Sequence, residues 1–418
     1  MEKELFRTII AESQEYIGRI HLVQRPLYLE EYGNYVFVGV RQAGKSYLLY
    51  QRIQQLLANG VEIENIVYVN FDDERLQGMS VTDLDLILQA YHSMYDSQPI
   101  FFFDEIQNVE GWANFARRLA NQKYRVYITG SNAKMLSRDI ETVLGGRYLD
   151  ISVFPYSFSE YLKAVGVLLS KNWQYGRKAN ELQRHFRTYF DWGGFPELVH
   201  FQEKRIWLNS LYNRIFFNDL VVRHKIKNED ALRLCVRRLA ESVKQPCSLN
   251  RLSNLIKATG TSCSPSTVME YVRYLQESCL LISIDNYVSK FVEKETIKKH
   301  YFVDNGLLHL FINNPNTSLL ENLCAITLYK KYAKGLYYYN KNIEVDFYVP
   351  DEGLAVQASY QMSDGETIER EVKALVALHG LHPLKRAMII TYEDEGEIVR
   401  DGLRIEIKPA WKWILEGL

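Results

Sequence analysis

The sequence has little that would direct it to a membrane, a metal centre or a disulfide framework. Its apolar runs, such as Ile100 to Phe103, are far shorter than the roughly 20 residues that a membrane-spanning helix needs. Its five cysteines form no C-x-x-C pair and have no histidine at a metal-ligand spacing, so we expect free thiols in a reducing compartment. The opening residues, MEKELFRTII, contain no apolar signal segment. We therefore expect a cytoplasmic protein with no membrane partner.

Net charge is almost absent as well. The formal charge of -1 over 418 residues provides no whole-molecule field toward nucleic acid or anionic lipid, so any DNA contact must come from a local patch. A hydrophobic content of 47% and a charged content of 24% are those of a globular protein. At roughly 150 residues per domain, the length indicates about three domains.

The N-terminal part alternates short apolar runs with helical stretches. Residues 1–33 have the pattern of a helix and a connector, and the five apolar runs follow as YVFVG, IVYVNF, IFFFD, RVYITGS and YLDISVFP. Fully apolar strands separated by amphipathic segments indicate a parallel sheet that helices cover on both faces. Residues 1–155 are therefore expected to form a three-layer α/β domain.

A phosphate-binding loop follows the first of these runs. Its residues match the pattern G-x-x-x-x-G-K-[ST] in full: Gly39, Val40, Arg41, Gln42, Ala43, Gly44, Lys45 and Ser46. The two glycines let backbone N–H groups turn toward a phosphate at a helix N-terminus, where the helix dipole favours negative charge. Lys45 is expected to reach the β- and γ-phosphates of ATP, and the Ser46 hydroxyl to bind Mg²⁺.

The runs IFFFD and RVYITGS end in polar residues that complete this site. Asp104 stands at the end of a buried strand, where it can hold Mg²⁺, and Glu105 beside it can polarise the attacking water as a general base; alternatively, Glu105 is a salt-bridge partner. Ser131 or Asn132 can face the γ-phosphate, or they cap the next helix. Arg147 can act as an arginine finger on its own or a neighbour's nucleotide, or it is a surface arginine beside a turn.

Several blocks resemble a family of bacterial and archaeal AAA+ ATPases. These blocks are GVRQAGKS, IVYVNFDDERL, FFFDEIQNVEGW, YITGSNAKML, LGGRYLDISVFPYSFSEYL and YFDWGGFPE, and the resemblance spans nearly the whole chain. It implies a P-loop sheet of strand order 5-1-4-3-2. It also assigns the Walker A role to Gly39–Ser46, the Walker B role to Asp104 and Glu105, the sensor position to Ser131 or Asn132, and the arginine of a G-R-Y element to Arg147.

The middle of the chain has the pattern of a helical segment and then a winged helix-turn-helix. Residues 156–227 read as a mostly helical, lid-like segment, in which Gly193 to Pro196 form either a hinge or a tight turn. Residues 228–295 contain three helical patterns and a strand, LLISIDNYV. Six basic residues and one acidic residue (Glu241) lie between 233 and 257, an excess that can meet a DNA backbone: Arg233, Arg237, Arg238, Lys244, Arg251 and Lys257. Many such modules only pack against protein, and Glu270 on the third helix would repel phosphate.

The tail, residues 296–418, resembles a degenerate restriction-endonuclease-like α/β domain. Glu321 lies in a helical pattern, and Asp346 is expected to end the strand IEVD. A working nuclease of this kind needs a carboxylate and a lysine on the next strand, where this sequence has Gln357 and Ser359. We therefore expect no nuclease activity from the tail.

Together these patterns predict Mg²⁺-dependent ATP binding and hydrolysis by an AAA+ core that acts as a switch or motor on a protein or DNA partner. Two alternatives stay open: a nucleotide-gated regulator without turnover, and an ATP-dependent nuclease. The sequence decides neither the partner nor whether the protein is a monomer or a homo-oligomer.

Overall fold

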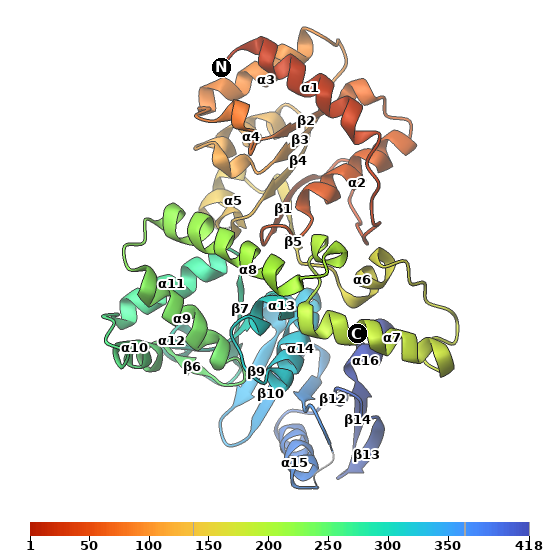
Figure 1. The fold of residues 1–418 in the computed structure, drawn as a ribbon, viewed down its shortest axis with the longest axis vertical. Coiled ribbons are helices and arrows are strands. Elements are labelled where there is room, and N and C mark those ends of the chain that lie inside the picture. Colours follow the sequence, from red (N-terminus) through yellow and green to blue (C-terminus); the bar gives the residue numbers. More distant parts are fainter. Residues whose placement is uncertain (137, 363–364, 418) are drawn as a thin grey trace. The chain divides into compact units, whose positions relative to one another are not determined.

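The computed structural model describes residues 1–136, 138–362 and 365–417 (Figure 1). The chain divides into two compact units, one of residues 1–154 with 277–279 and one of residues 155–276 with 280–418. No helix among the described residues is both long enough and apolar enough to span a lipid bilayer.

A five-stranded parallel sheet forms the centre of the first unit within the described residues. Its strand order is β2-β3-β4-β1-β5, which confirms the expected order 5-1-4-3-2. The strands are β1 (Asn34–Gly39), β2 (Ile66–Asn70), β3 (Ile100–Asp104), β4 (Arg125–Gly130) and β5 (Tyr148–Val153). The helices are α1 (Lys3–Ile17), α2 (Lys45–Ala58), α3 (Asp85–His92), α4 (Trp112–Asn121) and α5 (Arg138–Leu144), with 3₁₀ turns at Ile63–Asn65, Glu74–Leu76, Val81–Leu84, Ile106–Asn108 and Ala133–Leu136.

Successive side chains along each strand of this sheet point to opposite faces and so toward opposite helical layers. Phe101 and Phe103 of β3 belong to the core that α1, α3 and α4 close, together with Phe6 and Ile10 of α1. The intervening residue, Phe102, faces the other way and stacks on Tyr127 of β4 at a ring-centroid distance of 4.7 Å. Because side chains alternate along a strand, Asp104 faces the same layer as Phe102.

The second unit contains a mixed sheet, nine-stranded in the described part of the chain, of order β13-β14-β12-β11-β10-β9-β7-β8-β6. The strands are β6 (Cys247–Ser248), β7 (Leu281–Asn286), β8 (Ile297–Phe302), β9 (Tyr337–Asn340), β10 (Glu344–Val349), β11 (Leu354–Ala358), β12 (Arg386–Thr391), β13 (Gly396–Arg400) and β14 (Leu403–Pro409). The antiparallel strands β7 and β8 follow the three helices α9 (Glu229–Glu241), α10 (Leu249–Lys257) and α11 (Pro265–Glu277), and the winged helix-turn-helix stays a prediction.

Helices supply the rest of the second unit. They are α6 (Phe158–Ala164), α7 (Gly176–Trp192), α8 (Lys204–Arg214), α9 (Glu229–Glu241), α10 (Leu249–Lys257), α11 (Pro265–Glu277), α12 (Phe291–Thr296), α13 (Asn305–His309), α14 (Asn316–Tyr332), α15 (Gly365–Leu381) and α16 (Ala410–Glu416). A π-helix spans Ile215–Val222, and 3₁₀ turns lie at Glu197–His200, Ala333–Gly335 and Pro350–Glu352. Strands on both sides of residue 295 share one sheet, so the division of this unit into 156–227, 228–295 and 296–418 stays a prediction.

The Gly193–Pro196 element is a close-packed turn at the end of α7. Gly193 has φ 78°, and a Cβ at this position would lie 1.8 Å from the Asp304 carboxylate. That buried carboxylate accepts hydrogen bonds from the Gly194 and Gly306 amides, both at 2.8 Å. The segment is therefore held by backbone hydrogen bonds to a buried side chain, as a tight turn is.

Candidate nucleotide-binding site

The loop between β1 and α2 uses its two glycines for different reasons. A Cβ on Gly39 would lie 1.9 Å from the Val153 carbonyl oxygen of the adjacent strand β5, so only glycine fits there. Gly44 instead adopts φ 92° immediately before α2 begins, a left-handed conformation that side chains disfavour. Together they bend the chain so tightly that only five residues separate the end of β1 from the start of α2.

Lys45 is the first residue of α2, and its side chain is only 4% exposed. Its ammonium donates hydrogen bonds to the carbonyl oxygens of Gly39 and Val40, both at 3.2 Å. It also pairs with the Glu105 carboxylate at 3.3 Å. The loop therefore holds a buried cation at the place where its own backbone turns, as recognition of a polyphosphate requires.

Asp104 ends β3 and is 2% exposed. Its carboxylate accepts hydrogen bonds from the hydroxyls of Tyr68 at 2.8 Å, of Thr129, and of Ser46. Burial and the neighbouring Glu105 charge raise the pKa of this carboxyl, against the lowering effect of the three hydroxyls. Because Ser46 and Asp104 bring a hydroxyl and a carboxylate oxygen together, this pair fits the hard oxygen ligands that Mg²⁺ prefers.

Glu105 follows Asp104 with an unusual left-handed backbone, φ 53°. Its amide donates to the Thr129 hydroxyl at 3.0 Å, and its carboxylate accepts from the Gln107 amide at 2.5 Å. Burial would raise the pKa of the Glu105 carboxyl, but the Lys45 ammonium and the Gln107 hydrogen bond outweigh it and hold the pKa below its usual range. Glu105 is thus an ionised carboxylate aimed at the loop lysine.

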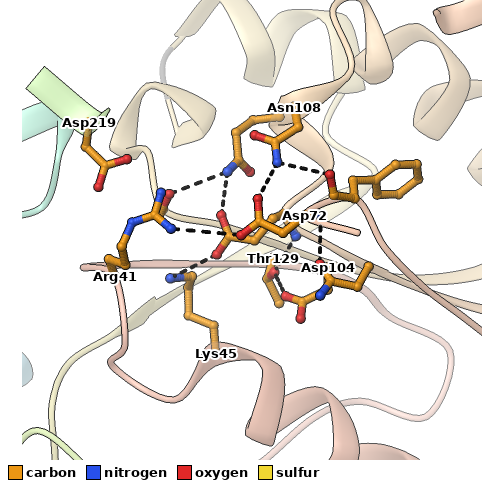
Figure 2. Close-up of polar contacts among 12 residues, drawn as sticks. Arg41, Lys45, Asp72, Asp104, Asn108, Thr129 and Asp219 are labelled. Atoms are coloured by element: carbon orange, nitrogen blue, oxygen red, sulfur yellow. Dashed lines mark hydrogen bonds and ion pairs between the residues drawn. The ribbon is translucent and has the colours of Figure 1, made fainter. Parts of the chain in front are cut away.

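A second group of polar side chains lies beside Lys45 and Asp104 (Figure 2). Arg41 of the loop approaches the Asp72 carboxylate at 3.9 Å. Asn108 donates to the same carboxylate at 2.6 Å and to the Phe71 carbonyl at 3.2 Å. The Arg41 guanidinium is therefore held near the phosphate-binding loop by the segment after β2.

The structure places the sensor and arginine candidates less tightly. Gln107 donates to Ser131 at 3.4 Å, which connects Ser131 to the Glu105 carboxylate. Asn132 is half-buried, and its backbone carbonyl accepts from the Met135 amide. Arg147 is exposed and donates to the Gly145 carbonyl of its own turn at 3.0 Å. The described geometry thus brings Lys45, Ser46, Asp104 and Glu105 together, whereas the roles of Asn132 and Arg147 stay predictions.

Three residues of the site were not expected from the sequence: Tyr68, Thr129 and Gln107. Tyr68 stands in β2 and Thr129 in β4, the two strands that flank β3. The sequence does contain a signal for the two strand residues. Because side chains alternate along a strand, Tyr68 and Thr129 point to the same face of the sheet as Asp104. Only the strand order shows that both flank Asp104.

The acidic residues of the tail form a separate cluster in the second unit. Lys299 of β8 is fully buried, and its ammonium pairs with Asp346 at 2.9 Å, Glu321 at 3.2 Å and Glu344 at 3.3 Å. The Tyr301 hydroxyl donates to Glu321 at 2.8 Å. The expectation that Asp346 ends a strand is wrong, because β10 runs on to Val349 and the carboxylate projects from inside it.

The cluster lies at one wall of a cavity of about 1010 Å³. Gln357 and Ser359, the two positions at which the sequence analysis looks for a carboxylate and a lysine, already have hydrogen-bond partners. Gln357 accepts from the Asp346 amide at 2.7 Å and donates to the Glu344 carbonyl at 3.1 Å. The Ser359 hydroxyl donates to the Gln361 carbonyl. A buried ammonium thus neutralises the carboxylates that a divalent cation would otherwise join.

The parallel sheet of order 2-3-4-1-5 and its loop define an AAA-type P-loop protein, and comparison with known families agrees. Residues 32–162 match a family described as an AAA domain, and residues 183–318 match a domain of unknown function (DUF8612). Uncharacterized protein MJ1544 of Methanocaldococcus jannaschii is 31% identical over 99% of this chain and 96% of its own length. An uncharacterized protein of Haemophilus influenzae is 30% identical over 91% of this chain and 94% of its own length.

The chain therefore belongs to the family of these two proteins, and its N-terminal part is an AAA domain. Among solved structures, the Walker-type ATPase PABY2304 of Pyrococcus abyssi is 12% identical, with a TM-score of 0.44, over 74% of this chain and 95% of that one.

Proposed function

We propose that this protein is a Mg²⁺-dependent ATPase whose AAA domain acts as a nucleotide-driven switch or motor on a protein or DNA partner. The observation that supports it best is the buried Lys45–Glu105 ion pair beside the Ser46–Asp104 pair. These are the four groups that ATP hydrolysis needs: a phosphate-binding cation, a base and two oxygen ligands for a metal.

Each residue of the loop has a role in this proposal. The amides of Gly39–Ser46 and the Lys45 ammonium bind the phosphates, while Ser46 and Asp104 hold Mg²⁺. Bound Mg²⁺ supplies positive charge that offsets the charge developing on the phosphoryl oxygens. Glu105 takes the proton of the attacking water. Asn132 or Ser131 senses the γ-phosphate, and Arg147 serves as an arginine finger in cis or from a second copy.

The ion pair also provides a reason for the order of events. As long as Lys45 neutralises Glu105, the carboxylate is a weaker base than a free one, because the nearby cation lowers its pKa. A triphosphate that draws Lys45 away removes this partner, and Glu105 then faces the water. The base becomes active only when the substrate is in place.

The second unit is proposed to convey the nucleotide state to the partner. In this proposal residues 156–227 form a lid, 228–295 a winged helix-turn-helix, and 296–418 a restriction-endonuclease-like domain without activity. The buried Lys299 among Glu321 and Asp346 supports the absence of nuclease chemistry, since the ammonium satisfies the carboxylates without a metal.

The test is steady-state phosphate release from ATP and Mg²⁺, with and without duplex DNA. We expect Glu105→Gln to bind ATP and to lose turnover at least about a hundredfold, in the range that removal of a general base produces. The exposed Glu110→Gln is the matched control and should keep wild-type turnover. Lys45→Ala should lose ATP binding, and tight binding by that variant would refute the site.

The comparison of turnover with and without duplex DNA distinguishes a DNA partner from a protein partner. Turnover that duplex DNA accelerates favours a motor that reads DNA through the second unit. Turnover that ignores DNA favours a protein partner, and the ATP-bound Glu105→Gln form is then the bait for capture. If the wild-type protein binds ATP but releases no phosphate, the alternative hypothesis of a nucleotide-gated regulator that does not hydrolyse ATP is favoured.

A further inference from the structure

The Asp104 carboxylate is held from both sides by hydroxyls of the neighbouring strands. Tyr68 of β2 donates to Oδ2 at 2.8 Å, and Thr129 of β4 donates to Oδ1. With one hydroxyl on each oxygen, the plane of the carboxylate is set by the sheet itself. A side chain at a strand end with no such partners would be free to choose among rotamers.

The Tyr68 hydroxyl has a second partner, Tyr50 of α2, at an oxygen–oxygen distance of 3.0 Å. The Tyr68 hydroxyl donates to Asp104, and a phenol has only one proton, so that proton points to Asp104. The Tyr68 oxygen is then the acceptor of the Tyr50 proton, and both hydroxyls point the same way, toward Asp104. Hydrogen bonds in such a chain polarise one another in a buried environment.

Packing keeps the chain of two phenols in this arrangement. The rings of Tyr50 and Tyr68 lie 5.1 Å apart, and Tyr68 is 6% exposed. The rings of Tyr16 and Tyr47 contact Tyr50 from the outer side at 6.2 and 5.7 Å. Tyr50 is therefore fixed between the surface aromatics and the strand.

We propose that Tyr68 is a positioning residue for Asp104, and that Tyr50 strengthens it through the chain Tyr50–Tyr68–Asp104. This inference rests on the proposed function, because its effect is on how well Ser46 and Asp104 accept Mg²⁺ with a nucleotide. Loss of the Tyr68 hydroxyl removes the partner of Oδ2 and leaves only the Thr129 and Ser46 hydroxyls on the carboxylate. The orientation of the Asp104 side chain is then less well fixed, and the oxygen that should face the ion is only partly in place.

The experiment measures the dissociation constant of ADP by calorimetry twice, once with Mg²⁺ and once with EDTA. The quantity compared is the dissociation constant in EDTA divided by the dissociation constant with Mg²⁺. This ratio isolates the contribution of the metal and needs no turnover. Tyr68→Phe should reduce the ratio about tenfold and leave the affinity in EDTA unchanged, since one hydrogen bond to a charged group is lost.

Tyr50→Phe should reduce the ratio about twofold to threefold, as expected for a partner that acts only by polarisation. The double variant should equal Tyr68→Phe, because without the second hydroxyl the first has no route to Asp104. In a parallel turnover assay, Tyr68→Phe should raise the Mg²⁺ concentration for half-maximal rate by a similar factor, with little change in the rate at saturation.

Tyr127→Phe is the matched control. Its hydroxyl is also buried in the same sheet, but it accepts from Arg52 at 3.1 Å and makes no described contact with Asp104. We expect its ratio to be that of the wild type, which excludes a general loss of packing as the cause.

The inference would be overturned, and the proposed function left intact, if Tyr68→Phe had the same ratio of ADP dissociation constants as the wild type. Additive effects of the two tyrosine substitutions on that ratio would have the same consequence. A wild-type protein with no Mg²⁺-dependent ADP binding would overturn both. Normal thermal unfolding of Tyr68→Phe together with the reduced ratio would establish a positioning role.

Discussion

Replacement of Lys299 with methionine tests the buried charge cluster of the second unit. The substitution keeps a side chain of similar length and removes the charge that faces Glu321, Asp346 and Glu344. Lys299 is fully buried, whereas the side chains of Glu321 and Asp346 are 5% and 15% exposed and that of Glu344 is 49% exposed. Two of the three carboxylates thus lose their neutralising partner while most of their surface is buried.

The magnitude follows from that difference in exposure. The half-exposed Glu344 is screened by solvent and contributes almost nothing. Removal of one partner of a buried ion pair destabilises by about 3–5 kcal/mol, because an uncompensated charge stays behind. We expect a loss of about 4 kcal/mol in the free energy of unfolding at pH 8, a large share of the stability of a domain.

The loss should depend on pH with a known sign. Burial and the Asp346 charge raise the pKa of Glu321 to about 7 even with Lys299 present, and without Lys299 it rises further. A carboxyl whose folded pKa is raised binds more protons when folded, so stability falls as pH rises from about 4.5, the unfolded pKa, to the folded pKa. Below about pH 7 Glu321 is protonated in the folded wild type as well as in the folded variant, so the penalty of the substitution is greatest above pH 7 and falls to a smaller, constant value below it.

The assay is urea unfolding followed by tryptophan fluorescence. Five of the six tryptophans belong to the second unit, so this signal reports on it: Trp173, Trp192, Trp207, Trp411 and Trp413. The control is Lys298→Met on the same strand, whose lysine makes a partly exposed pair with Asp285 at 3.0 Å and should contribute about 0–1 kcal/mol. Equal losses for Lys299→Met and Lys298→Met, or a loss that grows on acidification, would refute the reasoning. Recovery of stability by millimolar Mg²⁺ in Lys299→Met alone would show that the ammonium stands in a cation's place.

Three further substitutions test the backbone and the same cluster. Gly39→Ala should lower ATP affinity more than tenfold in a binding titration and destabilise by about 1–3 kcal/mol, since its Cβ meets the Val153 carbonyl; unchanged affinity would contradict the loop geometry. Gly193→Ala should destabilise by about 3 kcal/mol through its positive φ and the contact with Asp304, while ATP affinity stays at the wild-type value, and urea unfolding decides this. Glu321→Gln removes a group of raised pKa, so its stability relative to wild type should improve as pH rises from about 5 to about 7; a flat difference would mean that Glu321 titrates normally.

The second unit shows where sequence reasoning stopped short. The sequence pattern places a lysine for the Glu321–Asp346 pair two residues after Gln357, where the chain has Ser359. The structure provides Lys299 from β8, which β7 and β9 separate from β10 in the sheet order. No spacing rule connects residues 299 and 346, because their meeting depends on how several strands pack.

The nucleotide site divides in a similar way. The loop Gly39–Ser46 and the position of Asp104 were predictable, because a glycine spacing and a run of four apolar residues act within a few positions of the chain. The sheet order was also expected, although from a resemblance and not from periodicity. The Lys45–Glu105 pair needed the structure, since it requires the left-handed turn at Glu105 that aims its carboxylate back at the loop.

By itself, the sequence determined the elements: which segments are strands, where the phosphate-binding loop bends, and which acidic residues follow a buried strand. These depend on local preferences and on side-chain periodicity, which act over a few residues. Only the tertiary structure decided the partners, such as Tyr68 and Thr129 around Asp104 and Lys299 among the tail carboxylates. The reason is physical: a hydrogen bond or ion pair between distant residues depends on strand order and register, and these are set when the whole core packs.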